Sequence, residues 1–100
     1  MNKIYIKIHR AGDREVIAVC DCNLVGKCFK EKNLRLDVSE RFYKGDVASE
    51  DEVLVVISEA HTVNMVGEHS VALGVKAKIV FKENIIKIDG IPHAMSVKYE

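Results

Sequence analysis

Hydrophobic residues alternate with polar ones near the beginning of the chain. Ile4, Ile6 and Ile8 occupy every second position, a period that is typical of a strand with one buried face. The apolar run over residues 16–20 predicts a second strand, and the segment 11–13 between the two runs contains turn-forming residues. We therefore expect an antiparallel hairpin in this part of the chain.

The pattern is less regular over the next stretch. Asp21 or Asn23 has the chemistry to cap a short helix over residues 24–29. Alternation over residues 34–38 predicts a third strand. Residues 42–46 contain an aromatic pair followed by Gly and Asp, a composition that favours a loop.

A capping signal marks the start of a helix. Ser49 and Glu52 have the spacing of a capping box, and carboxylates are favoured in the first turn of a helix. The following residues 53–57 are rich in β-branched side chains and would suit a strand equally well. Because the cap favours the helix, we expect one from this cap to about Ala60.

A second helix is expected directly after the first. It would run from about Thr62 or Asn64 to about Lys76, and Gly67 would either break it or weaken it. After this helix the alternation returns: residues 86–88 and 95–99 follow a period of two.

Asp89-Gly90, between these last two stretches, is a strong hairpin signal. The predicted order is β-β-(α)-β-α-α-β-β. It indicates an α+β fold with a mainly antiparallel sheet and two helices packed on one face.

Composition limits the classes of protein. A chain of 100 residues has the length of one domain, so we expect residues 1–100 to form a single globular domain. The 15 Lys and Arg residues balance the 15 Asp and Glu residues, which excludes a chain-wide polycation but not a local basic patch. No apolar run approaches the ~20 residues of a membrane-spanning helix, so no membrane partner is expected.

The cysteines are clustered and odd in number. Cys20, Cys22 and Cys28 indicate reduced thiols in a cytoplasmic protein rather than a disulfide framework. Their spacing is not typical of zinc sites, and residues two apart on a strand point to opposite faces. We expect Cys20 to be a small buried hydrophobe, with no bound metal, no cofactor and no catalytic residue among the three.

Basic and aromatic side chains are interleaved along the first predicted strand. Lys3, Tyr5, Lys7 and His9 fall on one strand face. RNA-binding sheets combine cations that meet phosphates with rings on which bases stack. A solvated sheet face would show the same pattern, and the residues by themselves leave both interpretations open.

Four separated segments carry a resemblance to a known family. They are YIKIHR (5–10), EVIAVCD (15–21), NMVGE (64–68) and GIPHA (90–94). In this order they resemble a family of archaeal proteins of about this length that is catalogued as a domain of unknown function. The segment LVGK (24–27) is similar as well, whereas Cys22 and Cys28 lie outside the pattern. The resemblance implies a cytoplasmic protein associated with translation, and some members are described as RNA-binding.

Together, the basic strand and the resemblance favour a non-enzymatic RNA-binding protein. Its partner would be ribosomal RNA or the small ribosomal subunit of an archaeon, and its oligomeric state stays open. Phosphate and sugar contacts are expected from the basic strand and the turn after it, and a turn over residues 90–94 would present a histidine. The candidate RNA-binding residues are Lys3, Tyr5, Lys7, His9, Arg10, Arg14 and His93.

Two alternatives remain. A small enzyme would need His9, Cys20 and His93 to converge in one pocket. A protein–protein adaptor would expose an apolar patch on the acidic helix or on the Phe42-Tyr43 segment.

Overall fold

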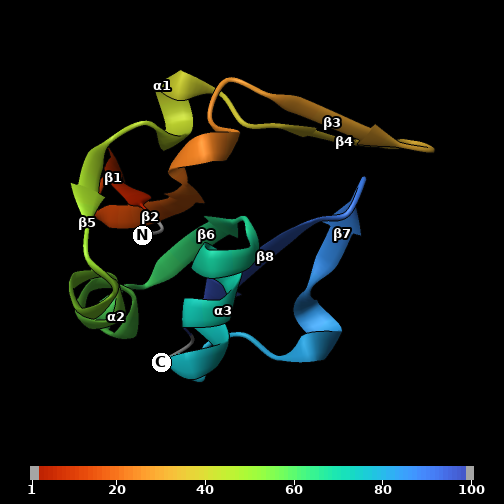
Figure 1. Cartoon of the computed structure of the whole chain (residues 1–100). Helices are drawn as coiled ribbons and strands as arrows, with labels where there is room; N and C mark the ends of the chain where they lie inside the picture. Colours follow the sequence, from red (N-terminus) through yellow and green to blue (C-terminus); the bar gives the residue numbers. More distant parts are fainter. Residues whose placement is uncertain (1–2, 99–100) are drawn as a thin grey trace.

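The computed structural model describes residues 3–98 (Figure 1). In chain order its elements are β1 (Ile4–Ala11), β2 (Arg14–Asp21), the 3-10 helix η1 (Cys22–Leu24), β3 (Cys28–Glu31), β4 (Leu34–Asp37), α1 (Glu40–Tyr43), β5 (Asp46–Ala48), α2 (Glu50–Glu59), β6 (Thr62–Val66), α3 (Glu68–Lys76), the 3-10 helix η2 (Lys82–Asn84), β7 (Ile86–Ile88) and β8 (Ile91–Val97).

Six of the strands form one mixed sheet in the order β5-β1-β2-β6-β8-β7. All neighbours are antiparallel except β2 and β6, which are parallel. Strands β3 and β4 form a separate hairpin. The α+β class and the β1–β2 hairpin are confirmed, and no helix within residues 3–98 is long and apolar enough to cross a membrane.

Helices α2 and α3 cover one side of the sheet, which we call the helix face (Figure 1). Its core is aliphatic, as expected for a chain without Trp. Val53 and Ile57 of α2 pack against strand residues such as Val19, Val63 and Met65, all of them almost fully buried. Burial of this apolar surface is the main stabilising contribution to the fold.

The opposite face is covered only in part. Helix α1, η1 and the β3–β4 hairpin pack over one portion of it (Figure 1). Leu24, Leu36 and Tyr43 from these elements bury Cys20 and Val66 of the sheet. The remaining portion of the face has no layer over it and carries the site described below.

The capping box of α2 is confirmed. The Ser49 hydroxyl accepts a hydrogen bond from the Glu52 amide at 3.2 Å, and the Glu52 carboxylate accepts one from the Ser49 amide at 3.0 Å. These hydrogen bonds hold the pKa of Glu52 below its ordinary value. The helix ends at Glu59, next to the predicted boundary at Ala60.

The second predicted helix is wrong over its first half. Thr62–Val66 is strand β6, and α3 begins only at Glu68. The reason is tertiary: β6 lies between β2 and β8, where β-branched side chains are buried on both faces. Gly67 separates strand from helix with a φ of 107°, a conformation that favours glycine.

Two expectations for the middle of the chain are also wrong. The helix expected over residues 24–29 is replaced by η1 and the start of β3. The loop expected over residues 42–46 contains the end of α1 and the start of β5, and α1 is capped by the Ser39 hydroxyl, which accepts from the Phe42 amide. The residues of these two segments have weak local preferences for helix or loop, and contacts with the sheet determine their secondary structure.

The last hairpin is confirmed, but the turn expected over residues 90–94 is wrong beyond Gly90, because Ile91–Val97 is strand β8 and His93 lies on that strand. Asp89 and Gly90 both have positive φ, 52° and 79°, as the central residues of a tight two-residue hairpin turn require. The expected strand over residues 95–99 is part of β8, and position 99 lies outside the described residues.

Candidate functional site

The uncovered portion of the opposite face is built from two rows of side chains that run across the strands. One row joins His9, Val16, Thr62 and Val97, and the next joins Lys7, Ala18, Asn64 and Met95. We call the accessible part of these rows, with the adjacent His93, the open surface. Its residues are Val16, Thr62, Asn64, His93, Met95 and Val97.

The open surface is apolar and exposed at the β8 end. Met95 is 52% exposed and Val97 is 41% exposed. Ile86 of the edge strand β7, directly opposite His93, is also exposed. Exposed aliphatic side chains grouped on one sheet face are typical of a surface that receives a partner.

The acidic side chains of the six strands lie on only one of the two faces of the sheet. The acidic residues of its six strands are Glu15, Asp21 and Asp46. The strand registers and the alternation of side chains place all of them on the helix face. Lys7 and Arg14 lie on the opposite face by the same alternation, so the strand positions of that face carry cations and no carboxylate.

Helix α1 covers part of the basic strand predicted to bind RNA. Lys7 is half-buried and donates a hydrogen bond to the Arg41 carbonyl. The His9 ring stacks on Phe42 with centroids 4.3 Å apart and planes 10° apart, and its Nε2 lies 2.8 Å from the Phe42 carbonyl oxygen. These two side chains therefore hold α1 against β1 and are only partly accessible to a ligand.

Arg10 and Arg14 lie on different faces. Arg10 forms an exposed ion pair of 3.0 Å with Glu15, its cross-strand partner on the helix face. Arg14 is exposed and flanks Val16 on the opposite face. Of these two arginines, only Arg14 can therefore extend the charge of the open surface, and the expectation that both contact RNA from one face is wrong.

The remaining predicted residues lie apart from each other. Lys3 precedes β1 and is exposed, and Tyr5 is half-buried. His93 lies on the same face as Tyr5, in a row with Cys20 and Val66 between them. The structure thus places Tyr5, Lys7, His9, Arg14 and His93 on one sheet face, and Lys3 and Arg10 elsewhere.

A polar trio lies at the boundary between the covered and the uncovered portions. The Tyr43 hydroxyl donates to Asn64 Oδ1 at 2.8 Å, and His93 Nε2 lies 3.2 Å from the same oxygen. Burial lowers the pKa of His93 and raises that of Tyr43 to about 12. At neutral pH the histidine is therefore neutral and the tyrosine keeps its proton.

Tyr43 and Asn64 were missed by the sequence analysis. Asn64 had been assigned to a helix and Tyr43 to a loop, so no signal connected them to His93. A polar Asn between Val63 and Met65, in a run of strand-forming residues, is the one feature that distinguishes position 64.

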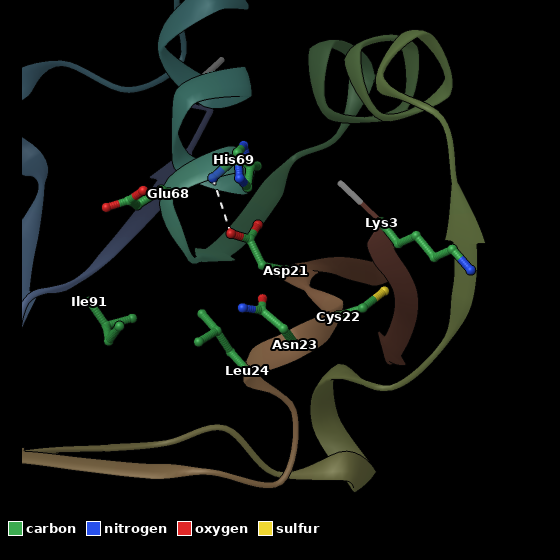
Figure 2. A pocket seen from close by; sticks show the side chains of 8 residues that line it. All are labelled: Lys3, Asp21, Cys22, Asn23, Leu24, Glu68, His69 and Ile91. Carbon is green, nitrogen blue, oxygen red and sulfur yellow. Dashed lines mark hydrogen bonds between the residues drawn. The ribbon is translucent and has the colours of Figure 1, made fainter. Parts of the chain in front are cut away.

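A hollow of about 570 Å³ lies beside the first turn of α3 (Figure 2). Its central carboxylate, Asp21, points to that turn and accepts hydrogen bonds from the His69 amide, the Ser70 amide and the Ser70 hydroxyl at 2.7–3.1 Å. Figure 2 shows Glu68 and Lys3 at opposite sides of the hollow. Asp21 is thus a buried cap of α3 whose oxygens are already used, and this hollow is a weaker candidate than the open surface.

The three residues of the enzyme alternative do not converge. Three strand spacings of ~4.8 Å and four residues of ~3.3 Å separate His9 from His93, roughly 20 Å in all. The Cys20 thiol is buried and donates to the Asp21 carbonyl, and burial raises its pKa to about 12. It therefore carries no thiolate at neutral pH, the form that acts as a nucleophile.

The other two cysteines are more accessible. Cys22 is half-buried, Cys28 is exposed, and both are free thiols. Within residues 3–98, no group of three or more His, Cys, Asp or Glu side chains is arranged to hold a metal ion.

Comparison with known proteins gives a family but no activity. The crystal structure of an uncharacterized conserved protein from Methanopyrus kandleri is similar, with a TM-score of 0.83 and 29% sequence identity over 98% of this chain and 95% of that chain. No curated protein matches the sequence. The family model described as "Protein of unknown function (DUF424)" matches residues 9–99, and the chain belongs to this family.

Proposed function

We propose that this member of the DUF424 family is a non-enzymatic protein that binds unpaired segments of RNA through the open surface. The observation that carries the proposal is the division of charge between the two faces of the sheet. On the opposite face, apolar side chains are flanked by cations, and the strand positions carry no carboxylate that would repel a phosphate backbone.

The exposed apolar side chains of the open surface favour single-stranded over duplex RNA. Bases that are not paired can lie flat on exposed side chains such as Met95 and Val97, while a duplex offers only its backbone and a shallow groove. The His9–Phe42 stack at the edge of the surface supplies aromatic rings of the kind on which bases stack.

Cations at the margin are placed to meet phosphates. Arg14 flanks Val16 on the sheet itself, while Arg41 and Lys44 are exposed on and just after α1, which packs over the same face. Such charges contribute affinity without base specificity, and they make binding depend on salt. The resemblance to proteins associated with translation favours ribosomal RNA, within the small subunit, as the natural ligand.

A charge reversal on each face tests the proposal. Arg14→Glu, on the opposite face, is expected to weaken binding to small-subunit RNA about tenfold at low salt. Arg10→Glu is the matched control: it makes the same change of charge four residues away but on the helix face, and should change affinity less than twofold. With three phosphate contacts, the log–log slope of wild-type affinity against salt should be roughly −2.

Several outcomes would overturn the proposal. Equal loss in both variants would mean that net charge, rather than the open surface, determines binding. Binding that ignores salt would contradict phosphate contacts. Capture of small subunits that survives ribonuclease treatment and is abolished by Met95→Asp would show that the open surface receives a protein instead of RNA.

A further inference from the structure

Strand β1 has an unpaired edge over its second half. Its outer neighbour, β5, lies opposite only the first three residues of β1, so residues 7–11 have a strand partner on the β2 side alone. The Lys3 carbonyl accepts from the Cys22 amide and continues the ladder between β1 and β2. Alternate residues of an antiparallel ladder direct both backbone groups to the same neighbour. The odd-numbered residues of β1 therefore bond to β2, and the backbone groups of Ile8 and Arg10 face outward.

These outward backbone groups are free. In the part of the chain that the structure describes, no hydrogen bond reaches the amide or the carbonyl of Ile8 or Arg10. The Ile8 side chain is itself 51% exposed. An edge of this kind offers a row of donors and acceptors with which an extended chain can pair.

A groove of about 400 Å³, which we call the edge groove, lies beside these residues. It is placed where β5 and the start of α2 flank the outer side of β1 (Figure 1). Ile6, Ile8 and Val56 contribute apolar side chains to its lining, and Asp46 and Glu52 contribute carboxylates. The groove therefore combines an apolar floor with acidic groups.

The carboxylates of the edge groove are available to a ligand. Asp46 and Glu52 are exposed, and neither forms an ion pair within residues 3–98. The hydrogen bond from the Ser49 amide helps to hold the pKa of Glu52 below its ordinary value, so Glu52 is ionised at neutral pH. Lys7 also lines the groove, but its ammonium group donates to the Arg41 carbonyl on the opposite face.

We propose that the edge groove binds an extended, basic segment of a partner protein. The segment lies along β1 as a further strand in line with β5, and its backbone pairs with that of Ile8 and Arg10. A lysine or arginine opposite Ile8 fits the mixed lining, because its aliphatic stem packs on Ile8 and Val56 while its charged end meets Asp46 or Glu52. This interaction is independent of RNA binding, which is proposed for the opposite face.

Charge favours this partner over two others. A nucleic acid would bring its phosphates to the carboxylates of the edge groove, which repel them. A second copy of the chain, joined edge to edge at β1, would bring together two α2 helices, each with four acidic residues and no basic one. Like charges at that junction would oppose association. A basic segment meets neither obstacle.

Amide hydrogen exchange in the wild-type protein tests the strand pairing. The probe is an eight-residue peptide with blocked ends in which lysine alternates with threonine, added at millimolar concentration. In the free protein, the amides of Ile8 and Arg10 should exchange rapidly, whereas those of Lys7 and His9 are protected by β2. We expect the peptide to slow exchange at Ile8 and Arg10 about tenfold and to leave Lys7 and His9 unchanged.

Two pairs of variants assign binding to the edge groove. Glu52→Gln removes a charge but keeps the capping box, and should weaken peptide affinity about threefold. Glu50→Gln makes the same change in the same helical turn, outside the groove, and should leave affinity unchanged. Ile8→Lys should weaken binding about tenfold by repelling the basic peptide. Val55→Lys, at an exposed position of α2 that does not line the groove, is its control.

Four results would overturn the proposal. The first is exchange at Ile8 and Arg10 that the peptide does not change. The second is equal binding of a peptide with proline in place of threonine, which keeps the charge but loses backbone donors. Equal binding of a peptide with glutamate in place of lysine would contradict the acidic selectivity. A dimer that Ile8→Lys dissociates would assign the β1 edge to a second copy of the chain.

Discussion

The two faces of the six-stranded sheet are built from the same strands but differ in burial: the helix face forms the main core, whereas the opposite face is partly exposed. Along β1 and β2, consecutive residues alternate between a helix face that buries Ile17 and Val19 and an opposite face that carries Lys7, Arg14 and Val16. The helix face gains its stability from two helices, so the opposite face is only partly needed for the core. Residues that are not needed for packing are free to serve recognition, and the three predictions below test this division.

The largest effect on stability is expected at the buried cap of α3. Asp21→Ala removes the acceptor of three hydrogen bonds and leaves the buried Ser70 amide and hydroxyl without a partner. We expect the free energy of unfolding to fall by about 3 kcal/mol. Chemical denaturation of this variant measures the change.

Asp46→Ala removes an exposed carboxylate from the same face and is the control, with an expected change within about 0.5 kcal/mol. Gly67→Ala offers a further check, because its added Cβ would lie 2.4 Å from the Asp21 carboxylate. It should cost less in the Asp21→Ala background than in the wild type. Additive costs would contradict the coupling.

Truncating one valine on each face compares how much the two faces contribute to the free energy of unfolding. Val63→Ala, on the helix face, removes a side chain that is 1% exposed and should lower the free energy of unfolding by about 2 kcal/mol. Val97→Ala, on the open surface, removes one that is 41% exposed and should cost under about 1 kcal/mol. Thermal unfolding of both variants gives the comparison, and similar costs would mean that the open surface belongs to the core.

The smallest effect is a dependence of stability on pH that originates on the opposite face. Burial holds the pKa of His93 in the folded protein below its ordinary value of 6.5. As the pH falls below 6.5, the unfolded chain binds a proton at this position more readily than the folded protein does. The free energy of unfolding should therefore decline in this range.

His93→Gln should make that decline shallower between pH 7 and pH 5. Urea unfolding of both proteins at several pH values measures the slopes. Parallel curves for wild type and variant would show that His93 does not titrate differently in the two states.

Structural features that depend on only one turn of the chain were predicted correctly from the sequence. The Ser49–Glu52 box and the Asp89-Gly90 turn depend only on their own neighbours, and both are confirmed. Strand β6 could not be predicted in the same way. Three of its five residues are β-branched and favour a strand, but the sequence does not reveal that the segment lies between β2 and β8.

The candidate site shows the same limit. Alternation correctly grouped Tyr5, Lys7 and His9 on one face, but it could not reveal that α1 would lie over two of them. Arg10 and Arg14 were separated by the hairpin register, which pairs Arg10 with Glu15. Tyr43 and Asn64 meet only because α1 packs over β1 and β2, from where the Tyr43 hydroxyl reaches Asn64 of β6.

The parallel pairing of β2 with β6 has a consequence for how the chain reaches its native state. Hairpin β1–β2 is local and can form as soon as it leaves a ribosome, but the second edge of β2 has no partner until β6 has been synthesised. Contacts this distant in sequence close slowly because the intervening chain must first lose its conformational freedom.

During that interval the nascent hairpin presents an unpaired edge and an uncovered apolar face, a combination that promotes association between chains. The six-stranded sheet can be completed only after β8 has emerged and paired with β6. The sheet is therefore expected to form in a late step, once β8 is available, rather than strand by strand as the chain emerges.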